Sequence, residues 1–123
     1  MDKLLQSVIF LVLYAPALNI VIADVPDSQI KEVNHLLAFV KSSGCIINRN
    51  GTDHSAEKGV SHIENKYDYF RDDIKNTEDF IEYSATKSTM SGDYYMVTCP
   101  GKKTIKTQDW LLHELERFRS GIK

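Results

Sequence analysis

The stretch Cys45-Ile46-Ile47-Asn48-Arg49-Asn50-Gly51-Thr52-Asp53-His54-Ser55 decides the fold. A short apolar run leads to an Asn-Gly pair, and a residue that can start a helix follows. A type I′ turn needs positive φ at both central positions, which favours Asn followed by Gly. The stretch therefore predicts a β-hairpin over 45–54. Cys45 stands at its start, and the polar side chains of Arg49, Asp53 and His54 lie near its tip.

Residues 1–23 differ from the rest of the chain and have the layout of a secretory signal peptide. A short start with one lysine precedes an apolar core, and small residues follow. The continuous apolar run is shorter than the ~18 residues that favour a membrane span. We expect cleavage after Ala23, with Ala15-Pro16-Ala17 as a second possible site and an uncleaved anchor as the alternative. Residues 24–123 then form one small domain with no stable membrane span.

Charge and cysteine content narrow the class of protein. The 123 residues include 15 basic and 17 acidic side chains, a formal net charge of −2. This balance argues against nucleic-acid binding. A domain of about 100 residues gains only modest stability from burying its core. Cys45 and Cys99 are the only two cysteines, and export to an oxidising compartment predicts that they form a disulfide. Two free, buried thiols are the alternative.

Apolar residues recur at helical spacing in four segments. The first helix is expected over 27–43, before Gly44. The second starts from a cap at Ser55, and its apolar face continues as far as Ile74. The third and the last helix are expected to start from caps at Thr77 and Thr107. The stripe of the last helix comprises Leu111, Leu115, Phe118 and Ile122.

Strand composition returns at 94–99, after a loop over 86–93 that is rich in small polar residues. This strand is the natural partner of the hairpin over 45–54. An exposed basic connection follows it, made of Lys102, Lys103 and Lys106. The sequence predicts an α+β fold of about four helices packed on a small, three-stranded antiparallel sheet with one disulfide.

Polar residues line the flank of the second helix, beside its apolar face. If this helix packs beside the hairpin, hairpin side chains face the same opening. Arginine, lysine and histidine donors suit an anion or another polar ligand, whereas the alternative is a solvated helix edge. Acid–base catalysis would need perturbed pKa values, so no residue is assigned a catalytic role. The candidate binding patch comprises Arg49, His54, His62, Lys66, Tyr69 and Asp73.

Two catalytic motifs are incomplete. Ser84-Ala85-Thr86-Lys87 matches the Ser-x-x-Lys motif of penicillin-recognising enzymes, but the chain is too short for that fold and Ser84 falls on the apolar face of its helix. His113-Glu114 resembles the start of a zinc-protease motif, but Arg117 occupies the position of the second histidine. We interpret His113 as a solvated partner of Asp109.

The remaining histidines give no specific metal signal. His35 is expected to point outward from the first helix. His54 and His62 with Asp53 are the best set of potential ligands, but they lack the paired spacing of zinc sites. The sequence therefore predicts neither a metal nor another cofactor.

Acidic residues cluster on the second and third helices. Such clusters are usually solvated surface, although this one could neutralise a basic toxin, as an immunity protein does. The cluster comprises Asp68, Asp72, Asp73, Glu78, Asp79 and Glu82.

Several short motifs follow one another along the chain: Ser43-Gly44-Cys45, Asn48-Arg49-Asn50-Gly51, His62-Ile63, Lys66-Tyr67, Thr77-Glu78-Asp79-Phe80-Ile81, Lys87-Ser88, Ser91-Gly92 and Cys99-Pro100-Gly101. In order and spacing, these motifs resemble the YfeK-like proteins, a family of small exported bacterial proteins of unknown function. The resemblance runs from about Ile30 to Phe118, and the chain departs from it at Asp93-Tyr94, where Pro-Tyr is expected. It implies a location in the Gram-negative envelope and supplies no activity.

Taken together, these features favour a noncatalytic periplasmic binding or protein-interaction domain. Its partner is expected to be an envelope protein or a small polar ligand that contacts the hairpin tip and the flank of the second helix. A small hydrolase or lyase that uses His54 or His62 with a nearby acid is one alternative. An immunity-type protein is the other.

Overall fold

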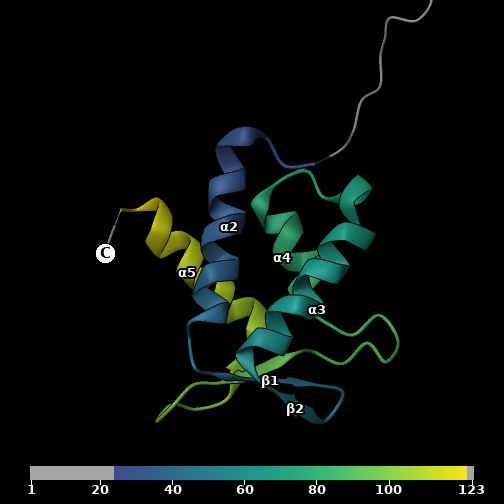
Figure 1. Ribbon diagram of the computed structural model, residues 1–123, viewed down its shortest axis with the longest axis vertical. Helices are drawn as coiled ribbons and strands as arrows, with labels where there is room; N and C mark the ends of the chain where they lie inside the picture. Colours follow the sequence, from purple (N-terminus) through teal and green to yellow (C-terminus); the bar gives the residue numbers. More distant parts are fainter. Residues whose placement is uncertain (1–23, 122–123) are drawn as a thin grey trace, which may run out of the picture.

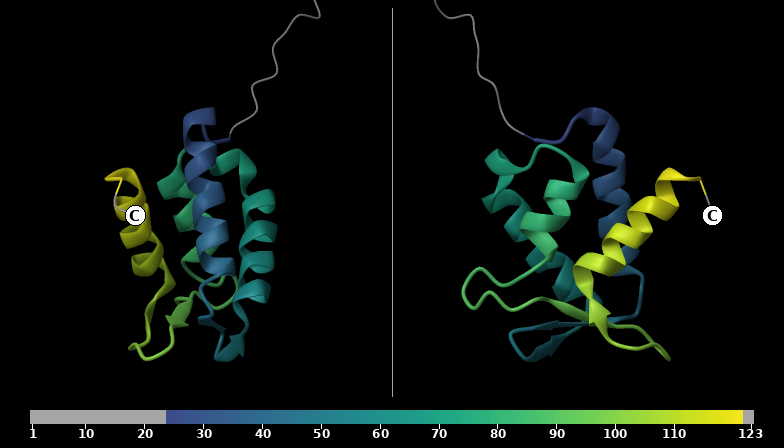
Figure 2. Two further views of the ribbon diagram at one scale, coloured as in Figure 1. Left: turned by 60° about the vertical axis from the view of Figure 1, so that its left-hand side comes forward. Right: turned by 180° about the vertical axis from the view of Figure 1, so that it is seen from behind.

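The computed structural model describes residues 24–121. The expected signal peptide and Ile122 lie outside the described residues. The helices lie together on one side of a small sheet, and no helix of residues 24–121 covers the other face of the sheet (Figures 1 and 2). This arrangement confirms the predicted α+β fold, with four α-helices, an antiparallel sheet and one disulfide among residues 24–121.

Helix α2, Asp27–Lys41, begins after Pro26 and buries an apolar stripe of Val33, Leu36 and Val40. Its end is followed by Gly44, whose φ of 70° lies in the left-handed region that glycine adopts without steric cost. The chain then turns directly into the hairpin.

The hairpin is confirmed. Strand β1, Ile46–Arg49, pairs antiparallel with β2, Thr52–His54. Asn50 and Gly51 form the turn with φ values of 53° and 78°, as a type I′ turn requires.

The sheet has one strand more than the sequence predicted. Strand β3, Met96–Thr98, pairs antiparallel with β1, and β4, Ile105–Lys106, pairs antiparallel with β3, so the order is β2-β1-β3-β4. The expected basic connection therefore ends in a short edge strand. Because Ile46 lies opposite Thr98, the residues just outside this pair come together, and the disulfide Cys45–Cys99 is confirmed.

Helix α3, Ala56–Tyr69, starts at the predicted cap, where the Ser55 side chain accepts from the Lys58 N–H at 3.2 Å. The expectation that this helix continues to Ile74 is wrong. It stops at Tyr69, and a short 3₁₀ turn, Arg71–Asp73, follows. The tighter turn brings Ile74 into the core, where its side chain is fully buried.

Two predicted caps are also wrong. Helix α4, Thr77–Ala85, is capped by Asn76, whose Oδ1 accepts from the Asp79 N–H at 2.7 Å. Helix α5, Thr107–Arg119, has no side-chain cap at its start. Thr77 and Thr107 are the first residues inside their helices, and both are buried, so neither hydroxyl caps its helix.

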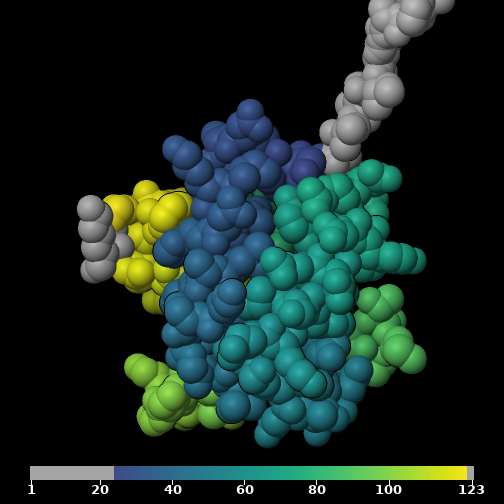
Figure 3. Space-filling view, viewed as in Figure 1, coloured from purple at the N-terminus to yellow at the C-terminus, as the bar shows by residue number. Residues whose placement is uncertain are grey.

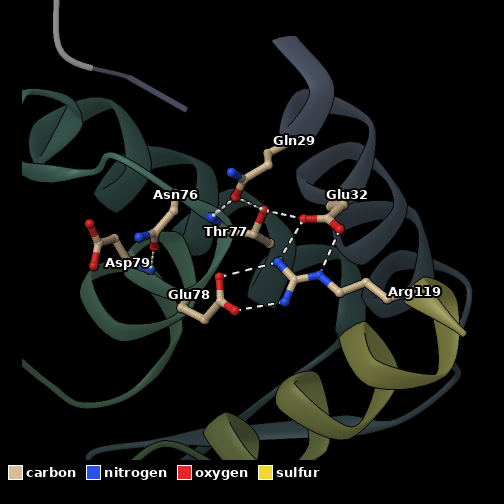
Figure 4. Close-up of polar contacts among 7 residues, drawn as sticks. All are labelled: Gln29, Glu32, Asn76, Thr77, Glu78, Asp79 and Arg119. Carbon is tan, nitrogen blue, oxygen red and sulfur yellow. Dashed lines mark hydrogen bonds and ion pairs between the residues drawn. The ribbon is translucent and has the colours of Figure 1, made fainter. Parts of the chain in front are cut away.

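One polar network holds three helices together (Figure 4). Arg119 at the end of α5 donates to Glu32 of α2 at 2.7 and 2.9 Å and to Glu78 of α4 at 2.7 and 3.2 Å. The buried Thr77 hydroxyl donates to Glu32 at 2.6 Å, and the Thr77 N–H donates to Gln29 at 2.8 Å. The guanidinium therefore bridges α2, α4 and α5.

The expectation that His35 points outward is wrong. Its Nε2 lies 2.6 Å from Glu114 Oε2, and its ring stacks on Phe118 with centroids 4.1 Å apart. Glu114 is 3% exposed and is also bonded by Arg117. A partly buried hydrogen bond thus joins helices α2 and α5.

Helix α3 approaches β1 at Gly59. A Cβ at this position would lie 2.8 Å from Cγ1 of Ile47, closer than packed carbon atoms come. Glycine therefore lets the helix backbone rest on the strand. This contact positions the next turn of α3 beside the hairpin tip, where the candidate site lies.

Candidate functional site

A hollow of about 330 Å³ lies between the hairpin tip, α3 and the loop that precedes β3. Arg49 comes from the hairpin, and His62 and Lys66 come from α3. Tyr95, just before β3, and the loop residues 88–90 complete the wall. In Figure 3 the loop, green at the right-hand side, stands beside the teal surface of α3. We call this hollow the basic pocket.

Three donors surround one phenol in the basic pocket. Arg49 NH1 lies 2.7 Å from His62 Nδ1, and His62 Nε2 lies 2.9 Å from the Tyr95 hydroxyl. Lys66 Nζ donates to the carbonyl oxygen of Lys87 at 2.8 Å and to the Tyr95 hydroxyl at 3.3 Å. The Lys66 ammonium also lies 5.1 Å from the centroid of the Tyr95 ring, within the range of a cation–π interaction.

The alternation of side chains along β1 and the spacing of residues on α3 explain how these side chains converge. Alternation along β1 places Arg49 on the same face as the buried Ile47, toward α3. His62 and Lys66 are four residues apart on α3, so they project from one side of the helix. Gly59, one turn before His62, brings that side against the strand.

Electrostatics keep the His62 ring neutral at neutral pH. Burial is the main cause that lowers its pKa, and the positive charges of Arg49, Lys66 and His54 add to it, so the pKa falls to about 4. Burial and the Arg49 charge also lower the pKa of Lys66. Burial raises the pKa of Tyr95.

The lining of the basic pocket includes two cations, Arg49 and Lys66, and no aspartate or glutamate among residues 24–121. The guanidinium alone offers five donors, and the Arg49 Nε is buried without a hydrogen-bond partner among residues 24–121. Neither Arg49 nor Lys66 forms an ion pair with a carboxylate within this part of the chain. The chemistry of the pocket suits an anionic acceptor.

The structure brings together four of the six candidate residues and separates the other two. Arg49, His62, Lys66 and Tyr69 line the basic pocket. His54 lines an adjoining hollow of about 390 Å³ that shares the Arg49–His62 wall. Asp73 lies in the 3₁₀ turn and lines neither hollow, because α3 has already ended.

Sequence reasoning missed Tyr95 and the loop residues of the basic pocket. Tyr95 is 3% exposed, and the strand-like composition of residues 94–99 indicated only that this side chain could be buried. Ser91 Oγ donates to Asn50 Oδ1 at 2.6 Å, which ties the loop to the hairpin tip. Nothing in the local sequence of a polar loop predicts such a contact with residues some 40 positions away.

Other candidate sites carry less chemistry. Ser84 is fully buried, so the Ser-x-x-Lys motif presents no accessible nucleophile. His113 lies exposed on α5. A larger hollow of about 530 Å³ borders α5, but two of its three charged residues, Glu78 and Arg119, already bond each other. Residues 24–121 contain no group of three potential metal-binding side chains, and Asp53 bonds Asn48 instead of joining the histidines.

The acidic cluster is partly engaged within the protein. Asp68 pairs with Arg71, Glu78 pairs with Arg119, and Glu82 accepts from Gln108 at 3.0 Å. Asp72 and Asp73 are exposed in the 3₁₀ turn. The surface is therefore less uniformly acidic than the sequence suggests.

Fold and site together define a small, disulfide-bonded α+β protein with a basic pocket beside its hairpin. Residues 27–119 match a family of unknown function, DUF5329, and the chain belongs to this family. It is also 32% identical over 96 residues to the uncharacterized protein YfeK of Salmonella typhimurium, an alignment that covers 77% of each chain. These findings confirm the resemblance to the YfeK-like proteins. No solved structure matches the chain. Within residues 24–121, no helix has the length and apolar character needed to cross a membrane.

Proposed function

We propose that the protein is an exported, noncatalytic binding domain whose basic pocket holds an anionic group of its ligand or partner. The observation that carries this proposal is the pair of cations that line the pocket with no carboxylate beside them among residues 24–121. Arg49 and Lys66 converge there without a carboxylate, and the Arg49 Nε is buried and unpartnered among the described residues. A buried donor without a partner costs about 1–3 kcal/mol, and an anion that accepts from it recovers this free energy.

Export is part of the proposal. The composition of residues 1–23 favours a signal peptide cleaved after Ala23, which leaves a single domain over 24–123. The disulfide Cys45–Cys99 fits an extracytoplasmic location. Together with the family resemblance, these features support the periplasm of a Gram-negative bacterium.

The surroundings of His62 favour binding over catalysis. A general base works best with a pKa near the operating pH, whereas burial and the neighbouring cations lower the pKa of His62 to about 4. The side chains that contact the His62 ring are Arg49 and Tyr95, and no carboxylate within residues 24–121 orients it. A hydrolase that uses this histidine lacks the acidic partner that would raise its basicity.

An NMR titration of the purified, disulfide-bonded protein with inorganic phosphate or acetate tests the proposal. We expect both anions to shift the signals of His62 and Tyr95 in a saturable way. Arg49→Gln and Lys66→Gln should each weaken this binding by about tenfold, since each removes a charge-assisted hydrogen bond. Lys102→Gln is the matched control, because Lys102 is exposed outside the pocket. Shifts that do not saturate, or that survive both pocket substitutions, would overturn the proposal.

A further inference from the structure

A second hollow adjoins the basic pocket at the Arg49–His62 pair. The second hollow is lined by His54 on β2 and Lys58 and Ser61 on α3. Arg49, His62 and Asn65 belong to the walls of both. The two hollows therefore lie next to each other along α3, and we call them together the basic groove.

The charge of the basic groove is opposite to that of the whole chain. The chain has a net charge of −2, yet no aspartate or glutamate among residues 24–121 lines either hollow. Three cations do: Arg49, Lys58 and Lys66. The nearest acidic hairpin residue, Asp53, lies on the opposite face of the strand pair and bonds Asn48 at 2.8 Å.

The cations are spread along the groove. Lys58, His62 and Lys66 recur every fourth residue, so they follow one side of α3. At ~1.5 Å per residue, the two lysines are about 12 Å apart along the helix axis. One small anion cannot contact both. An extended polypeptide advances ~3.3 Å per residue, so about four residues span this distance.

Apolar side chains border one end of the basic groove. Tyr69 is 80% exposed and Met90 is 94% exposed, and both line the basic pocket at the Lys66 end. Tyr69 also packs against Phe70 with ring centroids 4.8 Å apart. Exposed aromatic and methionine side chains beside polar groups are typical of surfaces that bind proteins.

Building on the proposed function, we infer that the groove binds an extended acidic segment of a partner protein. Carboxylates of this segment pair with Lys58, Arg49 and Lys66, and an apolar side chain of the segment packs against Tyr69 and Met90. Charge complementarity, the spacing of the cations and the mixed polar and apolar wall together favour a peptide over an isolated small anion.

Fluorescence anisotropy with a labelled peptide tests this inference. The probe contains a short run of glutamates followed by a phenylalanine, and glutamines replace the glutamates in the control peptide. We expect the acidic probe to bind more tightly than acetate. Lys58→Gln should weaken its binding by about threefold and Lys66→Gln by about tenfold, because Lys58 is exposed and Lys66 half-buried. Lys102→Gln and the glutamine peptide are the matched controls.

The outcomes separate the two proposals. If acetate and phosphate bind through Arg49 and Lys66 but the peptide binds no tighter, or ignores Lys58→Gln, the peptide inference is wrong and the anion pocket stands. If none of the three binds, both proposals are wrong. Equal weakening by Lys102→Gln, or tighter binding of a sulfated polysaccharide or an oligonucleotide to the same groove, also overturns the peptide inference.

Discussion

At the scale of single residues, the surroundings of His62 determine the protonation state of its ring. The ring lies between the Arg49 guanidinium and the Tyr95 phenol, with Lys66 one helical turn away. Burial, and then the cations around the ring, lower its pKa and make its protonated form unfavourable. The neutral ring therefore accepts a hydrogen bond from the Arg49 guanidinium on one side and contacts the Tyr95 hydroxyl on the other.

The depressed pKa of His62 predicts a pH-dependent stability. In the folded protein the His62 ring should titrate near pH 4, against about 6.5 for a histidine in the unfolded chain. Between these values the unfolded state binds more protons, so the free energy of unfolding falls as pH drops from about 6.5 to about 4. The loss is at most ~2 kcal/mol, because solvent screens a half-buried ring.

An NMR pH titration of the histidine ring signals measures this pKa directly. Lys66→Gln removes one of the cations and should raise the pKa of His62 toward 6.5, whereas Lys102→Gln should leave it unchanged. Urea denaturation across the same pH range should show a shallower pH dependence for His62→Gln than for the original chain. A His62 ring that titrates near pH 6.5 in the folded protein would contradict the account of the site.

Residues that obey short-range rules were predictable. Asn50-Gly51 forms the expected type I′ turn, and Ser55 caps α3. Thr77 and Thr107 look like caps in the sequence but are buried. A threonine at a helix start can cap it or enter the core, and only tertiary packing decides which.

At the scale of elements, boundaries depended on contacts that the local sequence does not contain. Strand β4 has two residues and forms only because β3 lies beside it. Helix α3 keeps its apolar spacing past Tyr69, yet the chain departs from the helix so that Ile74 can enter the core. Element types were therefore predictable from periodicity, whereas the last turn of a helix and a two-residue strand were not.

The bridge from α5 to α2 and α4 predicts a stability effect at this scale. Arg119→Gln should lower the free energy of unfolding by about 1 kcal/mol, since partly exposed ion pairs contribute little individually but this guanidinium serves two carboxylates. Arg119→Lys should not restore it, because an ammonium cannot reproduce the forked contacts. Urea denaturation measures both variants, with Lys103→Gln as a surface control.

Acid should reduce this stabilisation. Hydrogen bonds from Arg119 lower the pKa of both Glu32 and Glu78. Their contribution is present above the ordinary glutamate pKa of about 4.5 and is lost as pH falls below it. Arg119→Gln should therefore lose less stability than the original chain on acidification. A stability loss shared equally by Lys103→Gln would argue against a specific bridge.

At the scale of the whole molecule, the candidate site depends on segments far apart in the sequence. The hairpin and α3 are neighbours along the chain, and their polar residues were predictable as a patch. Tyr95 and the loop residues 88–90 arrive only because β3 pairs with β1 and Ser91 bonds Asn50. The donor-rich character of the basic pocket is a property of this tertiary arrangement.

The disulfide Cys45–Cys99 holds that arrangement at the ends of β1 and β3. It closes a loop with a sequence separation of 54, for which chain entropy predicts up to ~4 kcal/mol of stabilisation. Small domains are stable by only about 5–15 kcal/mol. Replacing both cysteines, Cys45→Ala with Cys99→Ala, should therefore lower the urea midpoint strongly, and alanine avoids placing a hydroxyl at the buried Cys45 position.

Reductant should reproduce this loss in the original chain and have no effect on the double variant. The oxidised protein should be lighter than the reduced one by two hydrogens in intact mass spectrometry. Because β1 carries Arg49 and β3 follows Tyr95, loosening their junction should also weaken phosphate binding at the basic pocket. Equal urea midpoints and equal binding with and without reductant would show that packing alone holds the two strands in register. The disulfide would then contribute neither to the stability of the protein nor to the basic pocket.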